Sequence, residues 1–140
     1  MRHNYRMSET DMGGGGDTVL RGRFLYNEPM CKHVSWRAGG AARRVYIPAD
    51  LEDLAWLVRS IPAHEPIHMV GLGSNLLVRD AGIRGVVVCP HGALGKLERL
   101  DATHVRAEAG VPCARLGRQA VKWGLGPASF FAGLPGPPGT

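Results

Sequence analysis

The chain has 140 residues, enough for one domain with a buried core, and its 44% apolar and 21% charged residues are ordinary for a globular protein. Its 20 glycines and 10 prolines make up more than a fifth of the chain and argue against a helical bundle. The net charge of +5 comes from basic residues spread along the sequence without interleaved aromatic residues, so nucleic-acid binding is not indicated.

The cysteines and histidines give no sign of a metal site. Cys31, Cys89 and Cys113 lack the spacing of metal ligands or of a redox pair, and we expect them to be reduced thiols. The six histidines form no pair at metal-ligand spacing. No apolar segment is long enough for a signal-peptide core or a membrane span, so we expect a cytoplasmic protein without a membrane partner.

Residues 1–21 are predicted to be a disordered leader, because they contain four consecutive glycines and little apolar pattern. We expect the folded domain to occupy residues 22–140. Residues 22–45 show no sustained hydrophobic period, and Gly39 and Gly40 mark a turn. The sequence RRVYIP after this turn is predicted to be a short strand that ends at Pro48.

Two helices are predicted. In the first, Asp50 is the expected N-cap, Pro62 lies just beyond the end, and apolar residues recur near helical spacing at Leu51, Leu54, Leu57, Val58 and Ile61. The second helix is expected between Pro112 and Gly124, with the glycine at the C′ position.

Three further segments are predicted to be strands: PIHMVG (66–71), GVVVC (85–89) and HVRAEAG (104–110). The second of them is apolar throughout, as in strands buried on both faces of a sheet. The terminal sequence GPASFFAGLPGPPGT is predicted to be a loop. Strands therefore alternate with helices, which indicates an α/β or α+β domain.

The most informative segment is the glycine-rich loop GLGSN, residues 71–75, which follows a predicted strand. Glycines allow successive backbone N–H groups to converge on an anion, and Ser74 and Asn75 add uncharged side-chain donors. Leu76 stands where a dinucleotide fingerprint has its third glycine, and no Walker lysine follows. The spacing alone supports phosphate binding and a plain strand connection equally.

Several motifs in order resemble the amino-terminal flavin-binding region of the UDP-N-acetylenolpyruvoylglucosamine reductases (UDP-N-acetylmuramate dehydrogenases). They are KHVSWRAGGAARRVYIP, GLGSNLLVRDAGIRGVVV, VRAEAGV and FFAGLPG, and the match runs from about residue 27 to residue 136. The resemblance implies an FAD-binding fold of the vanillyl-alcohol-oxidase (PCMH) type with two small α/β subdomains. In this family NADPH reduces FAD, which then reduces the enolpyruvyl group of a UDP-sugar in peptidoglycan synthesis.

The resemblance also implies cofactor contacts. In the glycine-rich loop, the residues expected around the pyrophosphate are Gly71, Gly73, Ser74 and Asn75. Gly110 would approach FAD through its backbone. Near the isoalloxazine the family has a G-[IL]-P-G-x-V-G-G loop, which is represented here by Gly133, Pro135 and Gly136.

The chain departs from the family pattern after Gly136, where it reads PPGT and ends. The family's catalytic serine, arginine and glutamate belong to segments beyond this point, so no residue here is assigned as catalytic. We therefore expect a carboxy-terminally truncated FAD-binding domain that is inactive alone, with a complementing carboxy-terminal chain as a possible partner. A smaller departure is GGAARR in place of the family's GGPAD, which affects the local turn.

Two alternatives remain at this stage: a non-catalytic FAD- or partner-binding module, and a small basic nucleic-acid binder. The second rests only on the pI of about 9.6. Trp36, Trp56 and Trp123 are expected in the core or at its boundary. For Phe130 and Phe131, ordinary core packing and packing beneath a flavin-facing loop are equally consistent with the sequence.

Overall fold

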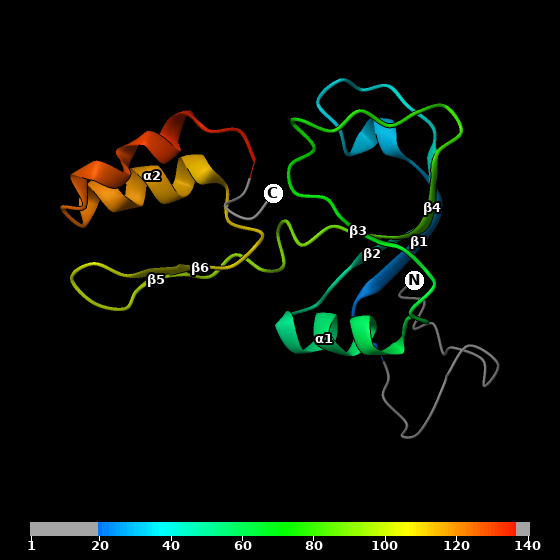
Figure 1. Ribbon diagram of the computed structural model, residues 1–140, viewed down its shortest axis with the longest axis horizontal. Helices are drawn as coiled ribbons and strands as arrows, with labels where there is room; N and C mark the ends of the chain where they lie inside the picture. Colours follow the sequence, from blue (N-terminus) through cyan, green and yellow to red (C-terminus); the bar gives the residue numbers. More distant parts are fainter. Residues whose placement is uncertain (1–19, 137–140) are drawn as a thin grey trace.

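The computed structural model describes residues 20–136. These residues form two lobes that lie side by side (Figure 1), one with the strands β1–β4 and helix α1, the other with β5, β6, α2 and the 3₁₀ helix η3. Both lobes combine strands with helices, so the predicted α/β class with two small units is confirmed. The leader predicted at the amino terminus falls almost wholly outside the described residues.

The first lobe contains a four-stranded sheet in the order β1-β2-β4-β3. Its strands are β1 (Arg23–Pro29), β2 (Ala41–Ile47), β3 (Ile67–Met69) and β4 (Ile83–Val88). Strand β1 is antiparallel to β2, whereas β4 runs parallel to both of its neighbours. The strands predicted at RRVYIP, PIHMVG and GVVVC are therefore confirmed.

Strand β1 lies in the segment without a sustained hydrophobic period, and no strand was predicted there. It is an edge strand and its residues are exposed or only partly buried, without the alternation that marks a strand with one buried face. The short 3₁₀ helix η2 (Met30–Lys32) follows it. Met30 is fully buried and fixes this segment to the core.

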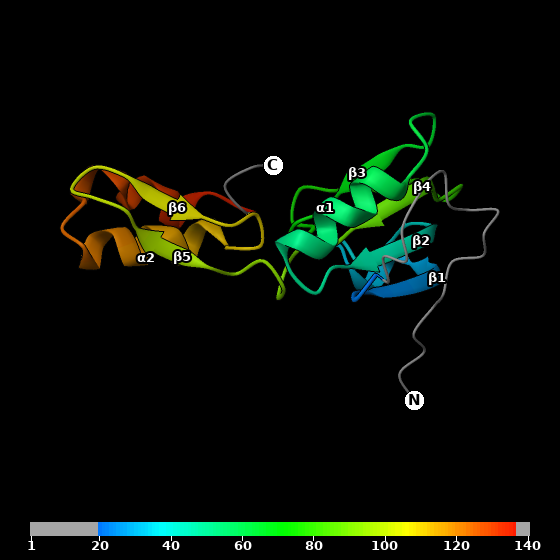
Figure 2. The same ribbon diagram turned by 90° about the horizontal axis from the view of Figure 1, so that it is seen from below.

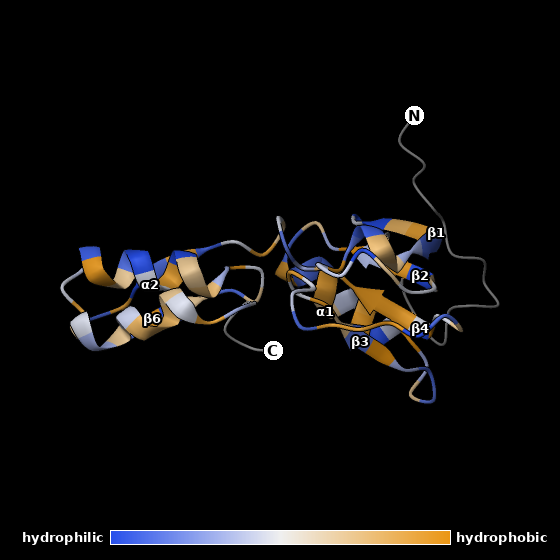
Figure 3. Cartoon of the chain, turned by 90° about the horizontal axis from the view of Figure 1, so that it is seen from above, coloured by the Kyte–Doolittle hydropathy of each residue, from blue (hydrophilic) through white to orange (hydrophobic). Residues whose placement is uncertain are grey.

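Two layers of apolar side chains cover the faces of the sheet. Helix α1 (Leu51–Ser60) lies on one side and the segments around residues 30–40 and 71–82 lie on the other (Figures 1 and 2). On the α1 side the core consists of Tyr46, Leu57, Val86 and Val88. On the opposite side it includes Met30, Val34, Val45, Val70, Val78 and Val87. Strand β4 contributes to both layers, as predicted, and is apolar along most of its length in Figure 3.

Helix α1 begins and ends as the sequence predicts. The Asp50 side chain accepts a hydrogen bond from the backbone N–H of Asp53 at 2.9 Å, and the helix ends just before Pro62. Asp53 itself is buried and accepts from the Tyr46 hydroxyl at 2.7 Å and from the backbone N–H of Arg21 at 2.7 Å. Arg21, expected at the end of the leader, is thus bonded to the first lobe.

The second lobe pairs β5 (Leu97–Arg99) with β6 (Val105–Ala107) in an antiparallel two-stranded sheet. The strand expected at HVRAEAG is β6, and β5 was not predicted. Helix α2 (Cys113–Lys122) occupies the predicted position, and Gly124 follows it with a positive φ of 75°. The terminal loop prediction was wrong, because residues Gly126–Gly133 form η3.

Close packing explains how η3 stays helical although none of its side chains is buried. It lies beside α2 (Figure 1), and a Cβ on Gly117 of α2 would come within 2.5 Å of the backbone nitrogen of Ala132. The absence of a side chain at Gly117 lets the two backbones approach each other. The same lobe contains a stacked pair, Phe130 and Phe131, with ring centroids 4.2 Å apart.

The prediction of core or boundary packing fails for Trp36, which is 70% exposed in the segment between η2 and β2. Trp56 is also exposed, although the Arg59 guanidinium lies 5.5 Å from the centre of its ring. Neither α1 nor α2, nor any other helix within residues 20–136, combines the length and hydrophobicity required to cross a membrane.

Candidate functional site

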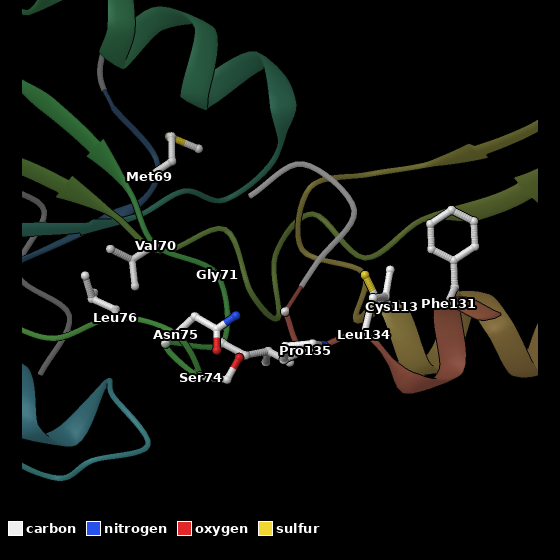
Figure 4. Close-up of a pocket in the computed structure, with 13 residues that line it drawn as sticks. Met69, Val70, Gly71, Ser74, Asn75, Leu76, Cys113, Phe131, Leu134 and Pro135 are labelled. Carbon is white, nitrogen blue, oxygen red and sulfur yellow. The ribbon is translucent and has the colours of Figure 1, made fainter.

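A cavity of about 760 Å³ lies between the two lobes (Figure 4). One wall comes from the first lobe, through the end of β3 and the glycine-rich loop, residues 71–75. The other wall comes from the second lobe, through Cys113, Phe131, Leu134, Pro135 and Gly136. Segments about 60 residues apart in the sequence thus face each other across a volume within the roughly 300–1,000 Å³ typical of ligand pockets.

The glycine-rich loop packs against the segment that follows η2, residues 33–35. The Ser35 backbone N–H donates to the carbonyl oxygen of Gly73 at 3.0 Å. Gly73 is buried and has a positive φ of 65°, and a Cβ there would lie 2.9 Å from the Cα of Val34 and still closer to the carbonyl oxygen of His33. Both the conformation and the close approach therefore require glycine at this position.

The polar side chains of the loop remain available to a ligand. Among residues 20–136, neither Ser74 nor Asn75 uses its side chain in a hydrogen bond. Figure 4 shows both side chains on the stretch of loop beside Leu134 and Pro135. A hydroxyl and an amide at this position can donate to an anionic oxygen without adding negative charge.

The second wall is anchored at the start of α2. The Cys113 backbone N–H donates to the carbonyl oxygen of Gly136 at 2.8 Å, which ties residues 134–136 to the helix. Phe131 and Leu134 give this wall of the cavity an apolar surface. A planar aromatic ligand would find apolar contacts here and hydrogen-bond donors at the loop.

A second cavity of about 410 Å³ lies next to the first, and Gly71 and Leu72 line both. Its other lining residues include four basic side chains, Lys32, His33, Arg37 and His91. Glu28 hydrogen-bonds His33 at 3.1 Å. Burial opposes ionisation of Glu28, yet its hydrogen bond to His33 and the Lys32 ammonium hold the pKa of this carboxyl below its usual value.

Cys89 forms part of the floor of this second cavity. Burial raises the pKa of its thiol to about 11, and the nearby Glu28 carboxylate acts in the same direction. The thiol is therefore neutral near pH 7 and does not repel an anionic ligand. Among the described residues no group of histidine, cysteine and acidic side chains is arranged to hold a metal ion.

Six of the eight predicted cofactor residues line the first cavity: Gly71, Gly73, Ser74, Asn75, Pro135 and Gly136. Gly110 does not line either cavity. It is buried under the turn at residues 90–94, where a Cβ would come within 2.5 Å of the carbonyl oxygens of Pro90 and Leu94. Gly133 ends η3, does not line either cavity, and has open space where a Cβ would be.

The basic residues of the second cavity were not predicted from the sequence. Lys32, His33 and Arg37 belong to one segment and His91 to another, and no spacing relates either segment to the glycine-rich loop. Only the fold brings them together. Gly110 contributes to this arrangement indirectly, since the His91 ring nitrogen Nδ1 lies 3.4 Å from its carbonyl oxygen.

Comparisons with known proteins point to one family. The profile of a family described as "FAD binding domain" matches residues 42–135. The UDP-N-acetylenolpyruvoylglucosamine reductase of Thiobacillus denitrificans is 60% identical over 149 aligned positions, which cover 97% of this chain and 46% of the relative. The reductase of the same name from Alkalilimnicola ehrlichii is 50% identical, over 84% of this chain and 39% of the relative.

A similar solved structure is the UDP-N-acetylenolpyruvylglucosamine reductase of Thermus caldophilus. It superposes with a TM-score of 0.52 at 22% identity, over 74% of this chain and 34% of that chain. This likeness supports the fold. The present chain spans less than half the length of the curated relatives it matches.

Proposed function

This chain belongs to the family of FAD binding domains, and on that basis we propose that it binds one FAD molecule across the two cavities, with the pyrophosphate on residues 71–75. The observation that supports this most strongly is that Gly71 and Leu72 line both cavities. An elongated dinucleotide with one half in each cavity must cross this loop. The middle of FAD is its pyrophosphate, the part that a glycine-rich loop suits.

The charges and donors around the loop support this orientation. Backbone N–H groups of the loop, with Ser74 and Asn75, offer donors to phosphate oxygens. On the side of the second cavity, Lys32 and Arg37 supply positive charge, and the neutral Cys89 thiol adds no repulsion. We assign the adenosine half to this cavity.

We assign the isoalloxazine half to the larger cavity, where apolar side chains meet residues 134–136. Pro135 and Gly136 would contact the ring system directly. We propose that Gly133 and Gly110 act indirectly, Gly133 by ending η3 before this segment and Gly110 by supporting the turn that carries His91.

For the reaction, we propose that the chain represents the FAD-holding part of an NADPH-dependent reductase that acts on UDP-N-acetylglucosamine enolpyruvate. The names of the relatives support the reductase activity and the UDP-sugar. Bound FAD supplies hydride transfer, which no amino-acid side chain can perform. The residues of this chain bind and orient the cofactor, and none of them is assigned a proton-transfer role. The substrate, the NADPH site and any complementing chain belong to this proposal.

The test of FAD binding is a titration of the 140-residue chain with FAD, followed by visible absorption after desalting. We expect flavin bands near one FAD per chain. Ser74→Ala should weaken binding about 10- to 150-fold, the cost of one hydrogen bond to a charged phosphate of roughly 1.5–3 kcal/mol. Ser129→Ala is the matched control, because Ser129 is exposed in η3 and lines neither cavity.

Two results would contradict the proposal. A folded chain that remains colourless after desalting and shows no saturable change in flavin fluorescence does not hold FAD. Equal affinity in Ser74→Ala and Ser129→Ala would mean that FAD does not contact the loop through this hydroxyl.

A further inference from the structure

The sheet of the first lobe ends in a strand with an open edge. Strand β3 pairs only with β4 among the described strands. The Pro66 carbonyl accepts from Val86 N–H, and Val70 N–H donates to the Val88 carbonyl at 2.9 Å. In a parallel ladder alternate residues face the partner strand, so the backbone N–H and C=O groups of Ile67 and Met69 point away from β4.

A groove of about 720 Å³ runs beside this open edge. Residues 66–70 form one side, and the other is formed by residues 76–82 of the connection and by Ile83 and Arg84 at the start of β4. Its surface is largely apolar, with Met69 at 48% and Leu77 at 72% exposure. Unpaired backbone groups next to apolar side chains match what an extended peptide presents, namely its own amides and alternating side chains.

The charged residues of the groove have one sign. Arg79 and Arg84 line it, together with His68, and no acidic residue does. Within residues 20–136 neither arginine side chain takes part in a salt bridge. His68 directs its Nε2 to the carbonyl oxygen of Arg84 at 3.2 Å. Both guanidinium groups are therefore available to a partner.

We propose that this groove binds an extended peptide segment of alternating apolar and acidic residues, which adds a strand to the edge of β3. Backbone hydrogen bonds to Ile67 and Met69 align the segment, and its carboxylates meet Arg79 and Arg84. The unpaired amides favour a peptide over a nucleic acid, whose sugar-phosphate backbone lacks the alternating N–H and C=O groups that pair with a strand. The basic groove disfavours a second copy of this chain, because two such edges would repel each other.

The experiment uses a fluorescein-labelled, terminally capped hexapeptide of alternating valine and glutamate. Its binding to the 140-residue chain is measured by fluorescence anisotropy at low salt. We expect saturable binding that weakens as salt is raised. The double variant Arg79→Glu/Arg84→Glu should bind at least about tenfold more weakly.

The matched control is Arg43→Glu/Arg118→Glu, which makes the same change in net charge at exposed arginines outside the groove. It should bind nearly as well as the unmodified chain. If both double variants lose affinity equally, the attraction is a general one and the proposal fails. A failure to bind the hexapeptide at all also overturns it.

Strand addition is tested separately with two hexapeptides that are N-methylated on alternate amides, in the two possible registers. Only one edge of the peptide pairs with β3, so one register should retain binding and the other should lose it. Equal behaviour of the two registers would exclude backbone pairing. A dimer of the chain that Arg79→Glu/Arg84→Glu dissociates would show that the groove is occupied by a second copy, and would overturn the acidic-peptide assignment.

Discussion

Replacing Gly73 with alanine tests whether the shape of the glycine-rich loop depends on the close approach of residues 33–35. The left-handed conformation at φ 65° costs an alanine about 1–2 kcal/mol relative to glycine. In addition, the new Cβ would lie 2.9 Å from the Cα of Val34, whereas ordinary contacts begin at 3.4 Å. Backbone must move to relieve this overlap, at a cost of about 1–3 kcal/mol.

We therefore expect Gly73→Ala to lower the free energy of unfolding by about 2–5 kcal/mol. The hydrogen bond from Ser35 N–H to the Gly73 carbonyl should be lost, and the loop should shift from its position over the cavity. Affinity for FAD should fall at least about tenfold, equivalent to 1.4 kcal/mol or more. Urea unfolding gives the stability, and quenching of flavin fluorescence gives the dissociation constant.

Gly92→Ala provides the matched control for this prediction. Gly92 also has a positive φ, 87°, but nothing lies within 4 Å of the position of its Cβ. This variant should lose only the conformational part, about 1–2 kcal/mol. Equal effects of the two substitutions on stability would refute the argument from close approach, and unchanged FAD affinity in Gly73→Ala would refute the role of loop shape.

Three further predictions follow from the described contacts and the length of the chain. Tyr46→Phe should lower the free energy of unfolding by about 1–3 kcal/mol, because Asp53 loses a donor and the Gly22 N–H loses its acceptor; an unchanged urea midpoint would contradict this. Cys89, with a pKa of about 11, has roughly 0.1% thiolate at pH 8, so iodoacetamide should label it in urea but hardly at all in the folded chain; rapid labelling of the folded chain at pH 8, read by mass spectrometry, would disprove its burial. The 140-residue chain should not oxidise NADPH in a manner that depends on the UDP-sugar, because it spans only 46% of the Thiobacillus denitrificans reductase; turnover in a continuous spectrophotometric assay would show that the described lobes suffice.

Local signals were enough to predict α1 and β4. The Asp50 cap, the spacing of apolar residues and Pro62 lie within one short segment, and the run of valines in β4 is buried on both faces. Strand β1 could not be found in this way, since an edge strand with little burial has no characteristic period. The helix η3 is stabilised by its close approach to Gly117, about ten residues earlier in the chain. No pattern within the sequence of η3 itself indicates this contact.

The site residues likewise fall into a group that local sequence motifs predict and a group that they do not. The glycine-rich loop is continuous in the sequence, and the family motif around Pro135 and Gly136 is as well, so both could be named before the structure was known. The basic lining of the second cavity comes from residues around Lys32 and from His91, which only the packing of the first lobe and the turn at residues 90–94 bring to the loop. Gly110 is also required by the close approach of the Pro90 and Leu94 carbonyl oxygens, a packing reason that the motif itself does not record.

The position of the larger cavity between two lobes links cofactor supply to stability. A ligand that touches both walls binds the assembled arrangement and has little affinity for an unfolded chain, so each increase in free FAD adds to the free energy of unfolding. At a free concentration one hundred times the dissociation constant the gain is about 2.7 kcal/mol, a large fraction of the total stability of an ordinary domain. The amount of folded protein would then follow the flavin available to it, and the unfolding temperature would rise with FAD even where no reaction takes place.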